Sequence, residues 1–240
     1  MRPIISNTLE VSFVVLAFTL FALIVWGVKK VCLNMGTDPI KARKTTLRTG
    51  FVLILWLMGL KQLSSMNFLD NWHDLPPHFL VIVVPPILAS ILLVVSPRFK
   101  NFLRHVPAHW TIYIQSFRIF MELILWGLFL EGIIGRQMTF EGRNFDVLVG
   151  LTALPIAYLV MSGKLKSKAW IIAWNIFGLI LLLNIVSVAI LSTPLPFRIF
   201  TEGPPNTMIA YFPFVWLPGF VVPVAFAMHL FSIQQTLQKK

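Results

Sequence analysis

Long apolar runs recur along the whole chain, and they constrain the fold more than any other feature of the sequence. Each run is roughly 18 to 24 residues long, the length that an α-helix needs to cross about 30 Å of hydrocarbon. Only 12% of the residues are charged and 57% are hydrophobic, whereas about a quarter are charged in a typical soluble domain. The sequence therefore predicts an all-α polytopic membrane bundle.

Seven apolar runs are separated by short polar loops, so we predict seven transmembrane helices in a single domain, 1–240. The spans are expected at residues 9–28, 46–65, 79–96, 110–133, 146–162, 169–191 and 209–231. The first run is followed by Lys29 and Lys30 and lacks a small-residue cleavage site. It therefore indicates a retained span and not a signal peptide.

The basic residues alternate between the two sides of the predicted bundle. Fourteen of the 20 lysines and arginines fall in the first, third and fifth loops and in the C-terminal tail, five fall on the other side, and Arg118 lies inside a span. Because cytoplasmic loops carry the excess of Lys and Arg, this pattern places the N-terminus outside and the C-terminus inside.

The formal net charge of +11 does not indicate nucleic-acid binding. The basic residues lie in short loops, where they orient the protein and meet anionic lipid, and no groove of basic and aromatic residues is evident. Cys32 is the single cysteine, so the sequence contains neither a disulfide framework nor a thiolate metal cluster. The expected partners are the lipid bilayer, a small-molecule ligand or another membrane protein.

The fourth expected span carries opposite charges near its middle. Arg118 and Glu122 are four residues apart on one helix face, with Gln115 one turn below, and this spacing allows an ion pair along the helix. Charged side chains inside a membrane face the bundle interior or a wet cavity. The pair is either a structural link between helices or part of a site for a ligand, ion or proton.

Other polar and aromatic residues could complete a pocket around this pair. We include Trp126, Tyr158 and Asn175 as candidate ligand-binding residues, because each lies within an apolar run. Spans three, five and seven carry internal prolines, and broken helices often mark binding sites in transporters. On the outer side, 135–145 and 192–208 are expected to fold over the bundle as a partial lid, with Glu141 or Glu202 paired to an arginine.

Histidines and enzyme motifs give little support for chemistry. His105, His109 and His229 are expected at one depth and could hold a metal or haem, but histidines at a membrane interface are the commoner explanation, so we predict no cofactor and no metal. The sequence contains neither HExxH nor Gly-x-Ser-x-Gly. An intramembrane enzyme using Glu122 as acid or base ranks last among the hypotheses.

Three stretches, MTFEGRNFDVLVGLTALP (138–155), WNIFGLILLLNIV (174–186) and FPFVWLPGFVVPVA (212–225), resemble a family of small uncharacterised seven-helix bacterial membrane proteins. The resemblance implies a bacterial inner membrane and brings no function with it. The first hypothesis is therefore binding or transport of a small molecule near Arg118 and Glu122, with Arg118 holding an anionic or polar group. The alternative is a signalling or accessory subunit with a structural ion pair.

Overall fold

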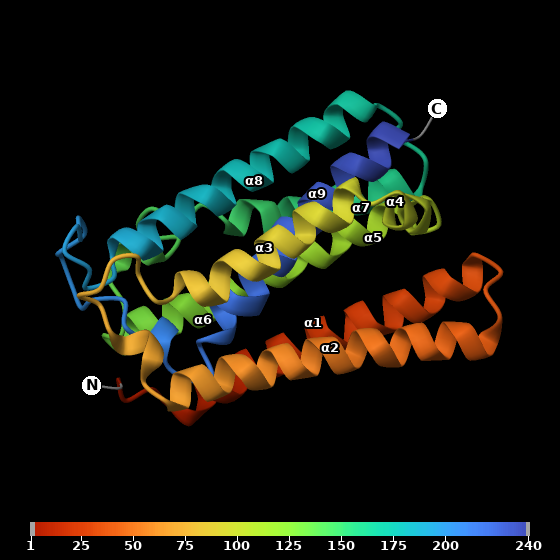
Figure 1. Ribbon diagram of the computed structural model, residues 1–240. Helices are drawn as coiled ribbons and strands as arrows, with labels where there is room; N and C mark the ends of the chain where they lie inside the picture. The colour runs from red at the N-terminus through yellow and green to blue at the C-terminus, as the bar shows by residue number, and fades with distance from the viewer. Residues whose placement is uncertain (1–2, 239–240) are drawn as a thin grey trace.

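Two long helices open the chain as an antiparallel hairpin. In the computed structural model, which describes residues 3–238, these are α1 (Asn7–Asn34) and α2 (Pro39–Ser65) (Figure 1). The Ser6 hydroxyl accepts a hydrogen bond from the first turn of α1, and the Asp38 carboxylate accepts two from the first turn of α2. Such caps satisfy backbone donors that have no partner within the helix. Arg2, Lys239 and Lys240, which enter the predicted charge count, lie outside the described residues.

The remaining helices pack beside this hairpin as rods of different lengths. In chain order they are α3 (Leu80–Val95), α4 (Pro97–Arg104), α5 (Ala108–Tyr113), α6 (Phe117–Leu130), α7 (Val147–Met161), α8 (Lys168–Leu191) and α9 (Val222–Gln238). Short 3-10 turns are η1 (Phe68–Asp70), η2 (Ile114–Ser116), η3 (Arg136–Met138) and η4 (Met208–Ala210), and η5 (Leu217–Val221) is a π-helix. No strand occurs within 3–238, so the all-α prediction is confirmed.

Several rods have the length and composition of membrane-spanning helices. Among the described residues, four qualify: Asn7–Asn34, Ala108–Leu130, Lys168–Leu191 and Leu217–Gln238. A fifth is obtained if α3 and α4, which are bent by 77° at their junction, form one broken span. The apolar helix α7 has only 15 residues, and α2 carries Arg48 and Lys61 in its apolar part.

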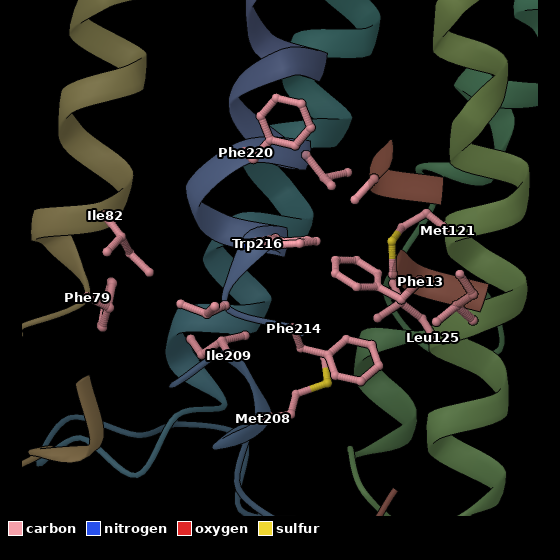
Figure 2. Packing of buried hydrophobic residues seen from close by; sticks show 14 of the residues in the cluster. Phe13, Phe79, Ile82, Met121, Leu125, Met208, Ile209, Phe214, Trp216 and Phe220 are labelled. Carbon is pink, nitrogen blue, oxygen red and sulfur yellow. The ribbon is translucent and has the colours of Figure 1, made fainter. Parts of the chain in front are cut away.

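The apolar core lies where α1 and α6 meet the last rod of the bundle. This rod is Leu217–Gln238 and consists of η5 and α9. The rings of Phe13 on α1 and Phe214 have centroids 4.8 Å apart. Figure 2 shows Met121 and Leu125 of α6 on the same side as this ring pair, with Phe79, the residue before α3, across the last rod. The core therefore joins the α1–α2 hairpin to the rest of the bundle through apolar contacts.

Prolines interrupt the last rod, and a neighbouring helix compensates for one interruption. Pro223 has no N–H with which to bond the carbonyl of Gly219 four residues earlier. The indole Nε1 of Trp56 on α2 donates to that carbonyl at 2.8 Å. A Cβ on Gly219 would lie 2.6 Å from Cδ1 of Leu60, so any larger residue here would require the Leu60 side chain to shift.

Trp56→Phe should remove this hydrogen bond and lower the free energy of unfolding by about 1 kcal/mol. The loss should be smaller in a Pro223→Ala background, because alanine restores a backbone donor for the Gly219 carbonyl. Thermal unfolding of the four variants in detergent measures this coupling. Trp170→Phe, at a tryptophan that is 70% exposed, is the matched control, and an equal effect of Trp56→Phe in both backgrounds would contradict the assignment.

Candidate functional site

A small cavity lies in the bundle between α3, α6, α8 and the last rod. Its volume is about 120 Å³, enough for several water molecules at roughly 10–15 Å³ each on the same kind of measure. Most of its wall is apolar and includes Phe79, Leu125 and Ile185. Four polar side chains belong to its lining: Arg118, Glu122, Asn144 and Asp146.

The buried ion pair of this site joins α6 to the start of α7. Nη1 of Arg118 lies 2.6 Å from Oδ1 of Asp146, and the two residues are 1% and 8% exposed. Gly150 in the first turn of α7 allows the helices to meet, because a Cβ there would lie 2.9 Å from the backbone nitrogen of Ile119. The predicted pair between Arg118 and Glu122 is therefore replaced by a pair between segments 28 residues apart.

Glu122 belongs to the same polar group through Asn144. The Asn144 side-chain amide donates to Oε1 of Glu122 and, at 3.2 Å, to the carbonyl of Met138. Its oxygen accepts a hydrogen bond from the backbone N–H of Asp146 at 3.1 Å. Asn144 therefore holds the chain before α7 in a fixed conformation and brings Asp146 toward Arg118.

Several polar atoms of the site have no hydrogen-bond partner within the described chain. They are Nε and Nη2 of Arg118 and Oε2 of Glu122, and all are buried. With one cation and two carboxylates, the fully ionised group carries a net charge of −1. Buried polar groups without partners are rare because each loses its hydration. The site therefore offers donors and one acceptor to water, a proton or a small guest.

The other predicted ligand-binding residues lie elsewhere in the bundle. Gln115 is buried and donates to the carbonyl of Ala225 at 3.0 Å, and Trp126 donates to Glu141 at 2.7 Å near the outer loops. Asn175 contacts α9, and Tyr158 is 56% exposed on α7. Of the six candidates, only Arg118 and Glu122 line the cavity.

A second buried polar group joins α8 to α9. Asn175 donates to the Ser232 hydroxyl at 2.9 Å, and its oxygen lies 2.9 Å from Nδ1 of His229. His229 is fully buried, whereas His105 bonds the carbonyl of Asn101 at a helix end. Within 3–238, no group of three His, Cys, Asp or Glu side chains is placed to hold a metal ion.

The 135–145 segment packs against α8 and the segment that follows it. Gln137 donates to the Ser192 hydroxyl at 3.0 Å, and Asn184 donates to the carbonyl of Arg143 at 2.7 Å. The predicted pairing of Glu141 with an arginine is confirmed, since Nε of Arg136 lies 3.7 Å from its carboxylate. Both contacts tie the 135–145 segment to α8 and its following loop.

Asn144 and Asp146 were not predicted as site residues. Asp146, the first residue of the expected span 146–162, is buried against Arg118. The sequence contains one indication of their role. Asn144 and Asp146 lie at the start of an apolar run that is too short to cross a bilayer alone. A buried arginine in another span is the partner that such a carboxylate requires.

Apolar helices packed around a cavity with four buried polar side chains define the class: an all-helical bundle with helices suited to a membrane and an internal polar group. Residues 75–237 match a family described as a domain of unknown function, DUF8737. Because this match covers more than half of the chain, the protein belongs to that family. The matched region contains all four polar residues of the cavity and begins after the α1–α2 hairpin. No curated protein and no solved structure matches the chain.

Proposed function

We propose that the protein is a multi-pass membrane protein of the bacterial inner membrane with seven spans, its N-terminus outside and its C-terminus in the cytoplasm. Support comes from the long apolar helices and from the distribution of basic residues in the sequence. The loop region where α1 turns into α2 is strongly basic, with Lys29 and Lys30 near the C-terminus of α1 and Lys41 near the N-terminus of α2. This loop and the α3–α4 bend then lie on the cytoplasmic side.

The shortness of α7 is compatible with a span because the preceding segment continues it. A helix of 15 residues is about 22 Å long, less than the roughly 30 Å of hydrocarbon. Non-helical backbone at membrane depth is tolerated where it is buried in protein or lines a cavity. Asn144 and Asp146 meet this condition, since both are buried and line the cavity.

A reporter that is active only in the cytoplasm should give signal when fused after Lys240 and none when inserted near Phe200. The physical reason is the excess of lysine and arginine on the cytoplasmic side of the bundle. Reporter activity in intact cells, normalised to the amount of fusion protein, is the measurement. A silent C-terminal fusion with an active one near Phe200 would overturn the orientation.

We further propose that the protein binds a small molecule in the cavity beside Arg118 and Glu122. The observation that supports this function best is that Arg118 and Glu122, which line the cavity, each have buried polar atoms without a partner in the described chain. A guest that bonds these atoms would recover hydrogen bonds that the protein alone leaves unmade.

Native mass spectrometry of the protein in mild detergent tests the proposal. A molecule bound to the wild type should be lost from Glu122→Gln, in which the amide replaces the free carboxylate oxygen at nearly the same shape. Glu202→Gln, at an exposed outer-loop position, is the matched control and should retain it. Equal occupancy in both variants would exclude this cavity as the binding site.

An accessory or signalling subunit is the second candidate, and a specific observation favours it. The Arg118–Asp146 pair and the Asn144 hydrogen bonds link α6 to α7, and such a link can act in folding alone. In that case no bound molecule would be found, while Arg118 variants would still lose stability and a partner subunit. Affinity purification of the wild type in the same detergent distinguishes the two candidates.

A further inference from the structure

The two sides of the cavity differ in polarity and in exposure. Every lining residue contributed by α6 and by the 138–146 segment is buried, including all four polar ones. The half-buried lining residues come from α3, α8 and the last rod, and they are apolar: examples are Leu80, Val83, Val186, Ala189 and Pro218. The polar group is therefore the deep end, and the apolar residues form the mouth.

The mouth opens on a flank that suits lipid. Both α3 and α8 pack against α9 (Figure 1), and next to the rim their outward side chains are large and apolar, with Val84 42% and Leu183 60% exposed. If the protein spans a membrane as proposed, this flank faces hydrocarbon. A guest would then reach the polar end from the lipid phase and not from water.

The charge of the polar end of the cavity determines which head group a bound molecule can carry. Arg118 is already paired with Asp146 at 2.6 Å, so the group is neutral when Glu122 is protonated and carries one excess negative charge when Glu122 is ionised. In neither state does it have a net positive charge to hold an anion. A second anion would be repelled strongly in a site of low dielectric constant. An ammonium or an alcohol head can donate a hydrogen bond to Oε2 of Glu122. The oxygen of an alcohol can also accept from the free donors of Arg118.

The volume limits how much of the guest is enclosed. About 120 Å³ is below the roughly 300–1,000 Å³ of pockets that enclose a drug-sized ligand. A head group and its first carbons would fill the deep end. The rest of the molecule would leave through the mouth along Val83 and Ala189.

From these observations we propose that the cavity takes a single-chain amphiphile whose head donates hydrogen bonds and carries no negative charge, such as an alcohol or an ammonium. This inference rests on the proposed binding function and names the ligand class of that site. It reverses the expectation from the sequence that Arg118 would hold an anionic group, because Asp146 already neutralises that side chain.

Probes that share one tail and differ in the head test the charge argument. We would titrate decylamine, decanol and decanoate into the full-length protein in nanodiscs of neutral phosphatidylcholine, with empty nanodiscs subtracted, and follow binding by calorimetry. Decylamine and decanol should saturate one site, and decanoate should not. Glu122→Gln should weaken decylamine binding by about tenfold or more, since a hydrogen bond to a charged group is lost.

Substitutions at the mouth of the cavity test whether the guest enters through it. Ala189→Trp on α8 and Val83→Phe on α3 should each abolish saturable decylamine binding, and Ala173→Trp, at an exposed position on α8, should leave it unchanged. The melting temperature of each variant verifies that it is folded. If Ala189→Trp does not fold, Val83→Phe alone tests the entry route. Preferred binding of decanoate, or insensitivity to folded rim variants, would overturn the inference.

The same experiments separate the ligand class from the binding function itself. If no decyl probe binds but Glu122→Gln still loses a co-purified molecule, the amphiphile inference fails and the proposed function stands. If no probe binds and no molecule co-purifies with the wild type, both fail. Saturable binding that is lost in Glu122→Gln and in the rim variants supports both.

Discussion

Arg118→Met should lower the free energy of unfolding by about 3–5 kcal/mol, because removing one partner of a buried ion pair leaves the other buried and unpaired. The partner is Asp146, 2.6 Å away and 8% exposed. The melting temperature in detergent is the measurement. Arg136→Met is the matched control: its pair with Glu141 is longer, at 3.7 Å, and exposed, so the loss should stay below about 1 kcal/mol.

The choice of compensating change identifies the true partner of Arg118. Asp146→Leu combined with Arg118→Met should recover much of the lost stability, since an apolar pair of similar volume often replaces a buried ion pair without loss. Glu122→Leu with Arg118→Met, the combination that the helix spacing in the sequence favours, should recover less. Equal rescue by both would show that Arg118 interacts with the two carboxylates alike.

Gly178→Ala should destabilise the protein by about 1–3 kcal/mol, the usual range for overpacking a tight interface. A Cβ at Gly178 of α8 would overlap the imidazole of His229, which is fully buried on α9. The loss should occur although alanine favours a helix over glycine by about 1 kcal/mol. Gly27→Ala on α1, where nothing lies within 4 Å of the new Cβ, should be neutral or stabilising.

A double-mutant cycle with His229→Ala separates packing from helix propensity. Removing the imidazole should make Gly178→Ala nearly harmless, although His229→Ala alone also loses the hydrogen bond to Asn175. Thermal unfolding of the four proteins gives the coupling energy, which should be well above the few tenths of a kcal/mol expected for independent sites. A coupling near zero would mean that α8 and α9 can separate slightly at little cost.

The helices could be predicted because apolar runs and polar breaks mark them directly. The expected 169–191 and 146–162 agree closely with α8 and α7, and 79–96 agrees with α3. The last rod begins at Leu217 and not at 209, because the prolines from Pro213 onward disturb its start. The short helix α4 was expected to be loop, although Phe99, Phe102 and Leu103 have helical spacing.

The site could be predicted only in part because its partners are far apart in sequence. Arg118 and Glu122 stood out since a charge inside an apolar run requires compensation. Their four-residue spacing favoured a local pair, whereas the bundle provides Asp146 and Asn144 from the next segment. Tyr158 was wrongly expected near the pocket, because its side chain points outward from α7. A mostly apolar helix has no polar stripe from which its inward face could be predicted.

The shortness of α7 also bears on how the chain enters the membrane during synthesis. A segment of 15 mostly apolar residues is a weak candidate for insertion by itself, because a spanning helix needs about 20 such residues. Arg118 precedes it along the chain, so if the protein spans a membrane as proposed, the segment that carries the guanidinium is synthesised before the aspartate. We therefore expect the Arg118–Asp146 ion pair to help α7 insert into the membrane as well as to stabilise the folded protein. Loss of the pair should produce chains with misplaced C-terminal segments as well as less stable ones.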